Sequence, residues 1–447
     1  MIWALSLFIL IAVAADMAGA PAGAQAAAGL PPAIQATPTA LSGQITSGTH
    51  IFIPLLLNGV IAQPASGGCA PQTVQDPLFL TSQPNMRLIH ADQAWANCLQ
   101  GSPTVVVAVV DGGVDLTHPD LVDNLLPGYN FVEDNTIPMD DNGHGTHVAG
   151  IIAASINGVG VVGVAPRVKI LPVRVMSNGS GTNSTIAAGI RWAADRAQII
   201  NLSLGGPSSS MVLQDAINYA IQTQGRLVIA AAGNDGATGN QTEYPAAFPG
   251  VIAVGAVDSS GQHASFSNTG SYVSLSAPGV GILSTVLNGS YGVKSGTSMA
   301  SPHVAGLAGL FWSRFPADTA DQIANLMKNT AVDQGDPGWD PVYGYGLIDA
   351  YPAGSLSASQ TASPAAPAQS LALPAEDRGA PIAPGRVLVK YKTGAGTAHR
   401  QVSGVIAGLG VQILSVPAGQ EWAEVDALRK LVSVEYAEPD FLEKTVP

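Results

Sequence analysis

The chain has 447 residues, a formal net charge of −13 and only 11% charged residues. This length exceeds that of a usual single domain, and 47% hydrophobic residues are enough to build a large core. An acidic chain without an arginine-rich run lacks the cations that neutralise phosphates, so the composition argues against a nucleic-acid partner.

The N-terminus has the pattern of a secretory signal peptide, assigned to residues 1–26. An apolar stretch over residues 2–15 is too short to span a bilayer, and runs of small residues suitable for cleavage follow it. We therefore expect a secreted, extracellular protein with no membrane contact once the signal is cleaved. Because no Lys or Arg precedes the apolar stretch, an uncleaved N-terminal anchor is the alternative. Residues 27–75 are assigned to an N-terminal extension or linker.

The chain has two cysteines, Cys69 and Cys98. In an oxidising compartment a pair favours a disulfide, and two free thiols are the alternative. No CxxC motif or third soft ligand accompanies them, so neither a metal site with cysteine ligands nor a cysteine nucleophile is expected.

Asp111 follows a run of apolar, largely β-branched residues at 104–110. Such a run predicts a buried parallel strand, which places Asp111 at its carboxyl end. Ligands bind at that edge of an open α/β sheet.

His144 and Ser298 each open a helical pattern of apolar residues. A helix N-terminus carries partial positive charge and unpaired N–H groups, so it disfavours an imidazolium and supplies donors for developing negative charge. Asp, His and Ser are together the parts of a nucleophilic relay. His147 lies three residues after His144, but no third ligand cluster follows, so we interpret it as a structural histidine and not as a metal ligand.

Between these motifs the chain alternates strand and helix patterns. Strands are predicted at 168–175, 199–204, 227–232 and 251–257, and helices at 184–197 and 212–222. The alternation predicts a doubly wound parallel sheet. Asn234 follows one of these strands and is interpreted either as an oxyanion ligand or as a turn residue before Gly236.

Five motifs occur in the order known from one enzyme family: AVVDGGVDLTHPDL, GHGTHVAG, NLSLGG, AAGN and GTSMASPHVAG. From about Asp76 to Tyr351 the chain resembles the subtilisin-like serine proteases, the subtilase family. DPLF at Asp76 and ADQAW bring it nearest to the thermitase-like members. The peptidase domain is assigned to residues 76–353.

The resemblance implies a serine endopeptidase with Asp111, His144 and Ser298 as catalytic triad and Asn234 as oxyanion ligand. It also implies a substrate cleft lined by Ser203, Leu204, Gly205, Gly206, Ala231, Ala232 and Gly233. These small residues leave room for a large apolar side chain, and Asp235 at the rim adds some tolerance of basic ones, so we expect broad specificity for protein or peptide substrates. A non-catalytic binding protein on the same scaffold is the alternative function.

The resemblance further implies a structural Ca²⁺ site, because hard oxygen ligands are what calcium requires. The side chains of Asp76, Asp120 and Asn157 and the carbonyl groups of Ser155, Val159 and Val161 are the implied ligands. A turn Asp beside a glycine-rich loop is the alternative.

Residues 354–384 have the Ser/Ala/Pro-rich composition of a linker. Residues 385–447 then carry a β-α-β-α-β pattern, with helices predicted from about Thr397 and at 422–431. This small α/β (ferredoxin-like) domain resembles the inhibitory prodomain of subtilases, which normally precedes the peptidase. The resemblance implies that the domain is an intramolecular inhibitor or folding aid whose tail, residues 442–447, lies near Ser298. An unrelated attachment module is the alternative.

Overall fold

The structure is a computed structural model that describes residues 74–352, 378–394 and 401–445. The predicted signal peptide, almost all of the N-terminal extension and most of the linker lie outside these ranges. Within them, no helix combines the length and the apolar character that crossing a membrane requires. Cys98 forms a disulfide, and the other cysteine of the chain, Cys69, lies outside the described residues.

A seven-stranded sheet in the order β2-β3-β1-β5-β7-β8-β9 forms the centre of the peptidase domain, and every neighbouring pair is parallel. Its strands are β1 (Val106–Asp111), β2 (Tyr129–Asn130), β3 (Lys169–Arg174), β5 (Ile199–Leu202), β7 (Leu227–Ala231), β8 (Ile252–Val257) and β9 (Val273–Pro278). The strands predicted between residues 104 and 257 are confirmed, except that the one at 199–204 is divided into β5 and the separate β6 (Leu204–Gly205). The pattern did not predict β9.

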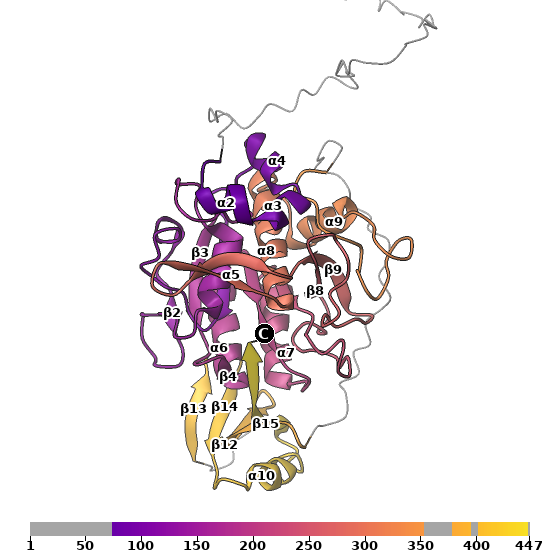
Figure 1. Ribbon diagram of the computed structural model, residues 1–447. Coiled ribbons are helices and arrows are strands. Elements are labelled where there is room, and N and C mark those ends of the chain that lie inside the picture. Colours follow the sequence, from indigo (N-terminus) through magenta and orange to yellow (C-terminus); the bar gives the residue numbers. More distant parts are fainter. Residues whose placement is uncertain (1–73, 353–377, 395–400, 446–447) are drawn as a thin grey trace, which may run out of the picture. The chain divides into compact units, whose positions relative to one another are not determined.

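Helices cover both faces of this sheet (Figure 1). On one face lie α5 (His144–Ala153) and α8 (Thr297–Arg314), and on the other α6 (Asn183–Ala194) and α7 (Met211–Asn218), which continues into the π-helical turn η3 (Tyr219–Thr223). Alternate residues of β1 serve the two faces: Val107 and Val109 belong to the core of α5 and α8, and Ala108 and Val110 to that of α6 and α7. Burial on both faces explains why the strands are continuously apolar.

Smaller elements complete the peptidase domain. They are α2 (Pro77–Ser82), α3 (Pro84–Leu88), α4 (Ala91–Ala96), η2 (Val122–Asn124), β4 (Ser180–Thr182), the hairpin β10 (Ile282–Val286) and β11 (Ser290–Lys294), and α9 (Ala320–Thr330). A capping box of Thr319 and Gln322 begins α9.

The C-terminal domain contains β12 (Ile382–Tyr391), β13 (Val402–Ile406), β14 (Val411–Ser415), α10 (Glu421–Leu428) and β15 (Val434–Thr445). The helix predicted from about Thr397 is wrong, because β13 pairs antiparallel with β14 within six residues of that point. Period-two pairing with a neighbouring strand overrides the local helical pattern there. In addition, the first three residues of β12, 382–384, lie inside the predicted linker.

The two faces of this small sheet have different partners. Val387 and Val389 of β12 face α10 and form a core with Val425, while Leu388 between them joins the core around α6 and α7, together with Tyr436 of β15. The sheet is therefore packed between its own helix and the two helices of the peptidase domain.

Candidate active site

Asp111 and His144 form the charge-bearing pair of the site. Asp111 ends β1 and is fully buried, and His144 Nδ1 lies 2.9 Å from its Oδ2 and 3.0 Å from its Oδ1. The close approach depends on Gly145, where a Cβ atom would lie 2.1 Å from the carbonyl oxygen of Gly113. A buried carboxylate at this distance orients the imidazole and stabilises its protonated form.

The loop before His144 holds the start of α5. Gly143 adopts a left-handed conformation with φ of 80° as the residue before the helix. Asp140 accepts hydrogen bonds from Gly143 N and Thr146 N, and Asn142 Oδ1 accepts one from His144 N at 2.9 Å. Burial raises the pKa of Asp140. These contacts satisfy N–H groups that the first turn of a helix leaves unpaired.

His147 is fully buried, and its Nε2 lies 3.0 Å from Ile282 O and 3.1 Å from Gly292 O. Burial lowers its pKa to about 3, so the ring is neutral. Donation to backbone carbonyls agrees with the interpretation of His147 as a structural residue that attaches α5 to the β10–β11 hairpin.

Ser298 lies in the first turn of α8 and is buried. Its Oγ donates to Ser203 O at 3.0 Å, and Ser203 Oγ donates in return to Ser298 O at 2.9 Å. His144 Nε2 is buried and has no hydrogen-bond partner among the described residues. The structure thus holds Ser298 against Ser203, the first residue of the predicted substrate segment.

Asn234 is oriented by its neighbour across the site. Its Oδ1 accepts hydrogen bonds from Thr297 N at 2.9 Å and from Thr297 Oγ1 at 3.0 Å. Because the carbonyl oxygen of the amide is held in this way, the orientation of the amide nitrogen is set as well. Thr297 directly precedes Ser298, so the orienting contact and the nucleophile belong to one turn.

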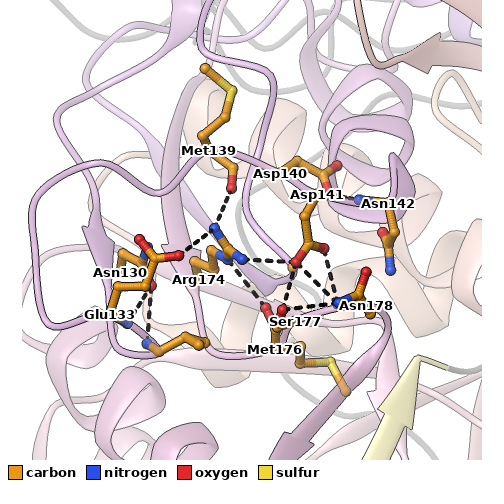
Figure 2. Close-up of polar contacts among 12 residues, drawn as sticks. Asn130, Glu133, Met139, Asp140, Asp141, Asn142, Arg174, Met176, Ser177 and Asn178 are labelled. Carbon is orange, nitrogen blue, oxygen red and sulfur yellow. Dashed lines mark hydrogen bonds and ion pairs between the residues drawn. The ribbon is translucent and has the colours of Figure 1, made fainter.

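Arg174 joins the loop before His144 to the loop before β4 (Figure 2). It donates from Nη1 to Met139 O at 2.9 Å and from Nη2 to Asp141 Oδ2 at 2.8 Å, and Asp141 also accepts from Ser177 Oγ at 2.7 Å. Sequence reasoning missed this arginine. The sequence around Arg174 is not informative on this point. An arginine at the end of an apolar strand can be buried in contacts or exposed to solvent, and the sequence pattern is the same in both cases.

The predicted substrate strand is paired within the structure. Lys444 lies opposite Gly205 and Thr445 opposite Leu204, while residues 442–444 pair antiparallel with β4. The last strand of the chain thus lies between β4 and β6. Thr445 and His144 line one pocket of about 290 Å³, together with Asn142, Lys294, Ser295 and Met299.

Residues 102–346 match the Subtilase family of peptidases. The chain belongs to the subtilase family. It is 46% identical to subtilisin DY of Bacillus licheniformis over 266 residues, which are 59% of this chain and 94% of that protein. It is a subtilisin-like serine endopeptidase.

Two further relatives differ in how much of their length this subtilase matches. The minor extracellular protease Epr of Bacillus subtilis is 46% identical over 266 residues, 59% of this chain and 40% of that protein. The thermophilic serine proteinase of Bacillus sp. strain AK1 is 45% identical over 285 residues, 63% of this chain and 69% of that protein. The match therefore spans less than half of Epr.

The implied calcium ligands of the subtilase gather at the loop after α5. Asp76 Oδ1 accepts from Asn157 N at 3.1 Å and from Gly158 N at 3.0 Å, and Asp120 Oδ2 accepts from Val161 N at 2.9 Å. The second carboxylate oxygens, Asp76 Oδ2 and Asp120 Oδ1, are buried without a hydrogen bond to any described residue. No cluster of three or more His, Cys, Asp or Glu that could bind a metal occurs in the described ranges, so a site here depends on carbonyl oxygens.

Proposed function

We propose that this subtilase is a secreted endopeptidase that hydrolyses peptide bonds through Asp111, His144 and Ser298 and that its C-terminal domain inhibits it intramolecularly. The observation that carries the proposal is the 2.9 Å contact of His144 with the buried Asp111. It is supported by the hydrogen bond from Ser298 Oγ to Ser203 O in the predicted substrate segment. A name among its relatives, the extracellular protease Epr, supports secretion.

The proposed reaction uses these groups in sequence. His144 Nε2 takes the hydroxyl proton as Ser298 Oγ attacks the scissile carbonyl, and His144 then gives the proton to the leaving amine. Water hydrolyses the acyl-enzyme by the same route. Asp111 keeps His144 in the tautomer that has Nε2 free to accept.

The negative charge that develops on the oxygen of the tetrahedral intermediate must be stabilised by hydrogen-bond donors. The amide nitrogen of Asn234 and the backbone N–H of Ser298 are the proposed pair, since Thr297 holds the amide oxygen of Asn234. A donor that is oriented before the reaction costs no reorganisation in the transition state, and this is why such groups are effective.

The cleft is proposed to bind substrates by strand addition to β4 and β6, in the position that β15 takes in the structure. Ser203, Leu204, Gly205 and Gly206 supply the strand, while Ala231, Ala232 and Gly233 form the other wall of the pocket. Small walls of this kind support broad specificity.

Inhibition by the C-terminal domain is supported by the place of β15 and by two carboxylates that precede its tail. Asp440 Oδ1 accepts from Ser184 N at 2.9 Å at the start of α6, and Glu438 accepts from Met211 N and Val212 N at the start of α7. A carboxylate at a helix N-terminus is favourable. Because the domain is tethered, its effective concentration is in the millimolar range for a flexible linker.

Calcium is proposed as a structural ion between Asp76 and Asp120. The two buried oxygens without hydrogen bonds fit a hard cation, with Asn157 and the carbonyl groups of Ser155, Val159 and Val161 as the remaining ligands. Nearby, burial and the negative charge of Asp120 and Asp76 raise the pKa of Tyr291. The ion would join the segment before α2 to the loop after α5.

The calcium proposal is tested by thermal unfolding of the Ser298→Ala chain, in which self-digestion is abolished. We expect a chelator to lower Tm by several degrees, because a ligand that binds only the folded state stabilises it. Without chelator, a chain that also carries Asp120→Asn should already have a lower Tm than Ser298→Ala alone, and the chelator should then change its Tm little. A Tm that a chelator leaves unchanged would exclude the site.

The enzyme and inhibitor proposals are tested together with three chains: the full chain, a chain that ends at Phe441, and Ser298→Ala. The chain ending at Phe441 keeps the pairing of β12 with β15 but lacks the residues that enter the cleft. We expect it to hydrolyse a peptide substrate at least about tenfold faster than the full chain. Equal rates would reject the inhibitor. Absence of labelling by a fluorophosphonate in both active-serine chains would support the non-catalytic alternative.

A further inference from the structure

Glu243 is a buried acid between the two walls of the proposed substrate pocket. A Cβ atom on Gly205 would lie 2.8 Å from Glu243 Oε1, and one on Gly233 would lie 3.2 Å from Glu243 Cβ. The neighbouring Tyr244 exchanges two backbone hydrogen bonds with Gly206, at 2.8 and 3.0 Å. This bridge fixes the segment of Glu243 beside β6, so the carboxyl lies where the side chain before the scissile bond would enter.

The carboxyl group of Glu243 is not paired with a cation within the described residues. Glu243 is only 5% exposed, and no described residue forms a hydrogen bond or an ion pair with its carboxyl group. The charged groups that interact with it are the acids Asp235 and Glu443. Burial, and then the charge of Asp235, raises the pKa of Glu243 to about 8. An isolated buried carboxylate is costly, and a cation placed beside it removes that cost.

The tail of the chain does not provide this cation. Glu443 is 1% exposed and brings a second carboxyl against Gly206, whereas Lys444 is exposed. Tail and pocket are therefore not complementary in charge, and the carboxyl of Glu243 still lacks a countercharge when β15 lies in the cleft.

We propose that Glu243 selects peptides with Lys or Arg directly before the scissile bond. The inference rests on the proposed function and adds a charge requirement to the wide pocket, in place of the apolar preference that its small walls alone predict. A guanidinium or ammonium group that reaches Glu243 would form an ion pair largely shielded from water. Removal of one partner from such a pair is strongly unfavourable.

The test compares two peptide anilides that are identical except for arginine or norleucine before the anilide. Norleucine is apolar and similar in length to the stem of arginine, so charge is the difference that is measured. The full chain is used, because a competitive blocker lowers kcat/KM for both substrates by the same factor and leaves their ratio unchanged. The ratio is determined for wild type, Glu243→Gln and the matched control Asp321→Asn, which removes an exposed carboxylate from α9.

We expect wild type to prefer arginine about tenfold or more. Glu243→Gln should lower the ratio of kcat/KM values about 30-fold, mainly by a loss on arginine, and Asp321→Asn should leave it at the wild-type value. The rate on norleucine shows whether Glu243→Gln has folded. If this variant does not fold, the ratio in wild type is measured against pH. It should rise between pH 6 and 9 as Glu243 ionises among Asp235, Glu443 and Tyr272, which face it.

Two outcomes would overturn the inference. A wild-type preference for norleucine, or an arginine preference that Glu243→Gln leaves unchanged, would remove Glu243 as a specificity determinant while the protease remains. If neither peptide is cleaved and Ser298 is not labelled by a fluorophosphonate, the proposed function itself fails, and the specificity fails with it.

Discussion

The two faces of the central sheet use the same property of helices for different purposes. On one face, α5 begins at His144 and α8 begins at Thr297, directly before Ser298, so the N-termini of these helices lie at two of the proposed catalytic residues. On the other face, the N-termini of α6 and α7 are covered by Asp440 and Glu438 from a segment more than 220 residues later in the chain. A helix N-terminus attracts negative charge in both cases.

The two faces therefore depend on different physical properties: the first on the geometry of its side chains, and the second on the burial of charged groups. Orientation of His144 by a fully buried carboxylate is a geometric requirement, whereas docking of the C-terminal domain depends on carboxylates that lose water when they are covered. Burial raises the pKa of Glu438 to about 7 and also raises the pKa of Asp440. Changes on the first face should therefore abolish activity, and changes on the second should release it.

The largest effect is expected on the catalytic face. Asp111→Asn should lower kcat about 10⁴-fold, the loss typical of serine proteases in which this carboxylate is replaced, because the imidazole then favours the wrong tautomer. This loss is measured as the rate of peptide hydrolysis when Asp111→Asn is introduced into the chain that ends at Phe441. An unchanged Tm shows that folding is intact, and a loss below about tenfold would contradict the role of Asp111.

Asn234→Ala should lower kcat about 10²–10³-fold, the loss typical of subtilisin-like oxyanion donors. KM should change little, because the contact forms mainly in the transition state. Steady-state kinetics separate the two constants. A rise in KM with constant kcat would instead assign Asn234 to substrate binding.

On the docking face, Glu438→Ala combined with Asp440→Ala should accelerate peptide hydrolysis by the full chain about 30-fold. The change removes two side chains that accept hydrogen bonds from helix N-termini, and each such contact contributes about 1 kcal/mol. Asp426→Ala is the control, since it breaks only the exposed ion pair with Arg378 in the same domain. Equal acceleration by the control would attribute the effect to general destabilisation.

The smallest expected effect is a dependence of inhibition on pH. Burial raises the pKa of Glu443 well above its usual value, and the pKa of Glu243 beside it is about 8. Around the docking carboxylates, Arg386 forms an ion pair with Asp440, and Lys390 forms one with Asp215 at 2.7 Å.

Acids with a raised pKa bind more protons in the docked state than in the released state. Their contribution to docking is complete below the ordinary carboxyl pKa of about 4.5 and is lost as the pH rises through about 7 to 8. The rate of the full chain, divided by that of the chain ending at Phe441, should rise about tenfold between pH 6 and 8. A ratio that falls with pH would contradict this linkage, and the division cancels any dependence on pH that the two chains share.

Local sequence was sufficient for much of the peptidase fold. The apolar runs predicted β1, β3, β7 and β8 because strands buried on both faces need uninterrupted apolar residues. Asp111, His144 and Ser298 were found because the motifs around them are local, and the structure brings Asp111 into contact with His144.

Residues that act over long range had no such signal. Glu243, Arg174 and the pairing of β15 with β4 depend on segments that meet only after folding. The helix predicted from about Thr397 is wrong for the same reason, since β13 is stabilised by its partner β14 and not by its own residues.

The sequence by itself therefore determined the fold class, the family and the motifs that carry the chemistry, because these depend on residue type and short-range periodicity. Only the tertiary structure decided which segment pairs with β4 and β6 and which buried acids lack a countercharge. Both depend on burial and on contacts between residues distant in the chain, as in the 2.7 Å contact of Ser184 Oγ with Asp440 across 256 positions.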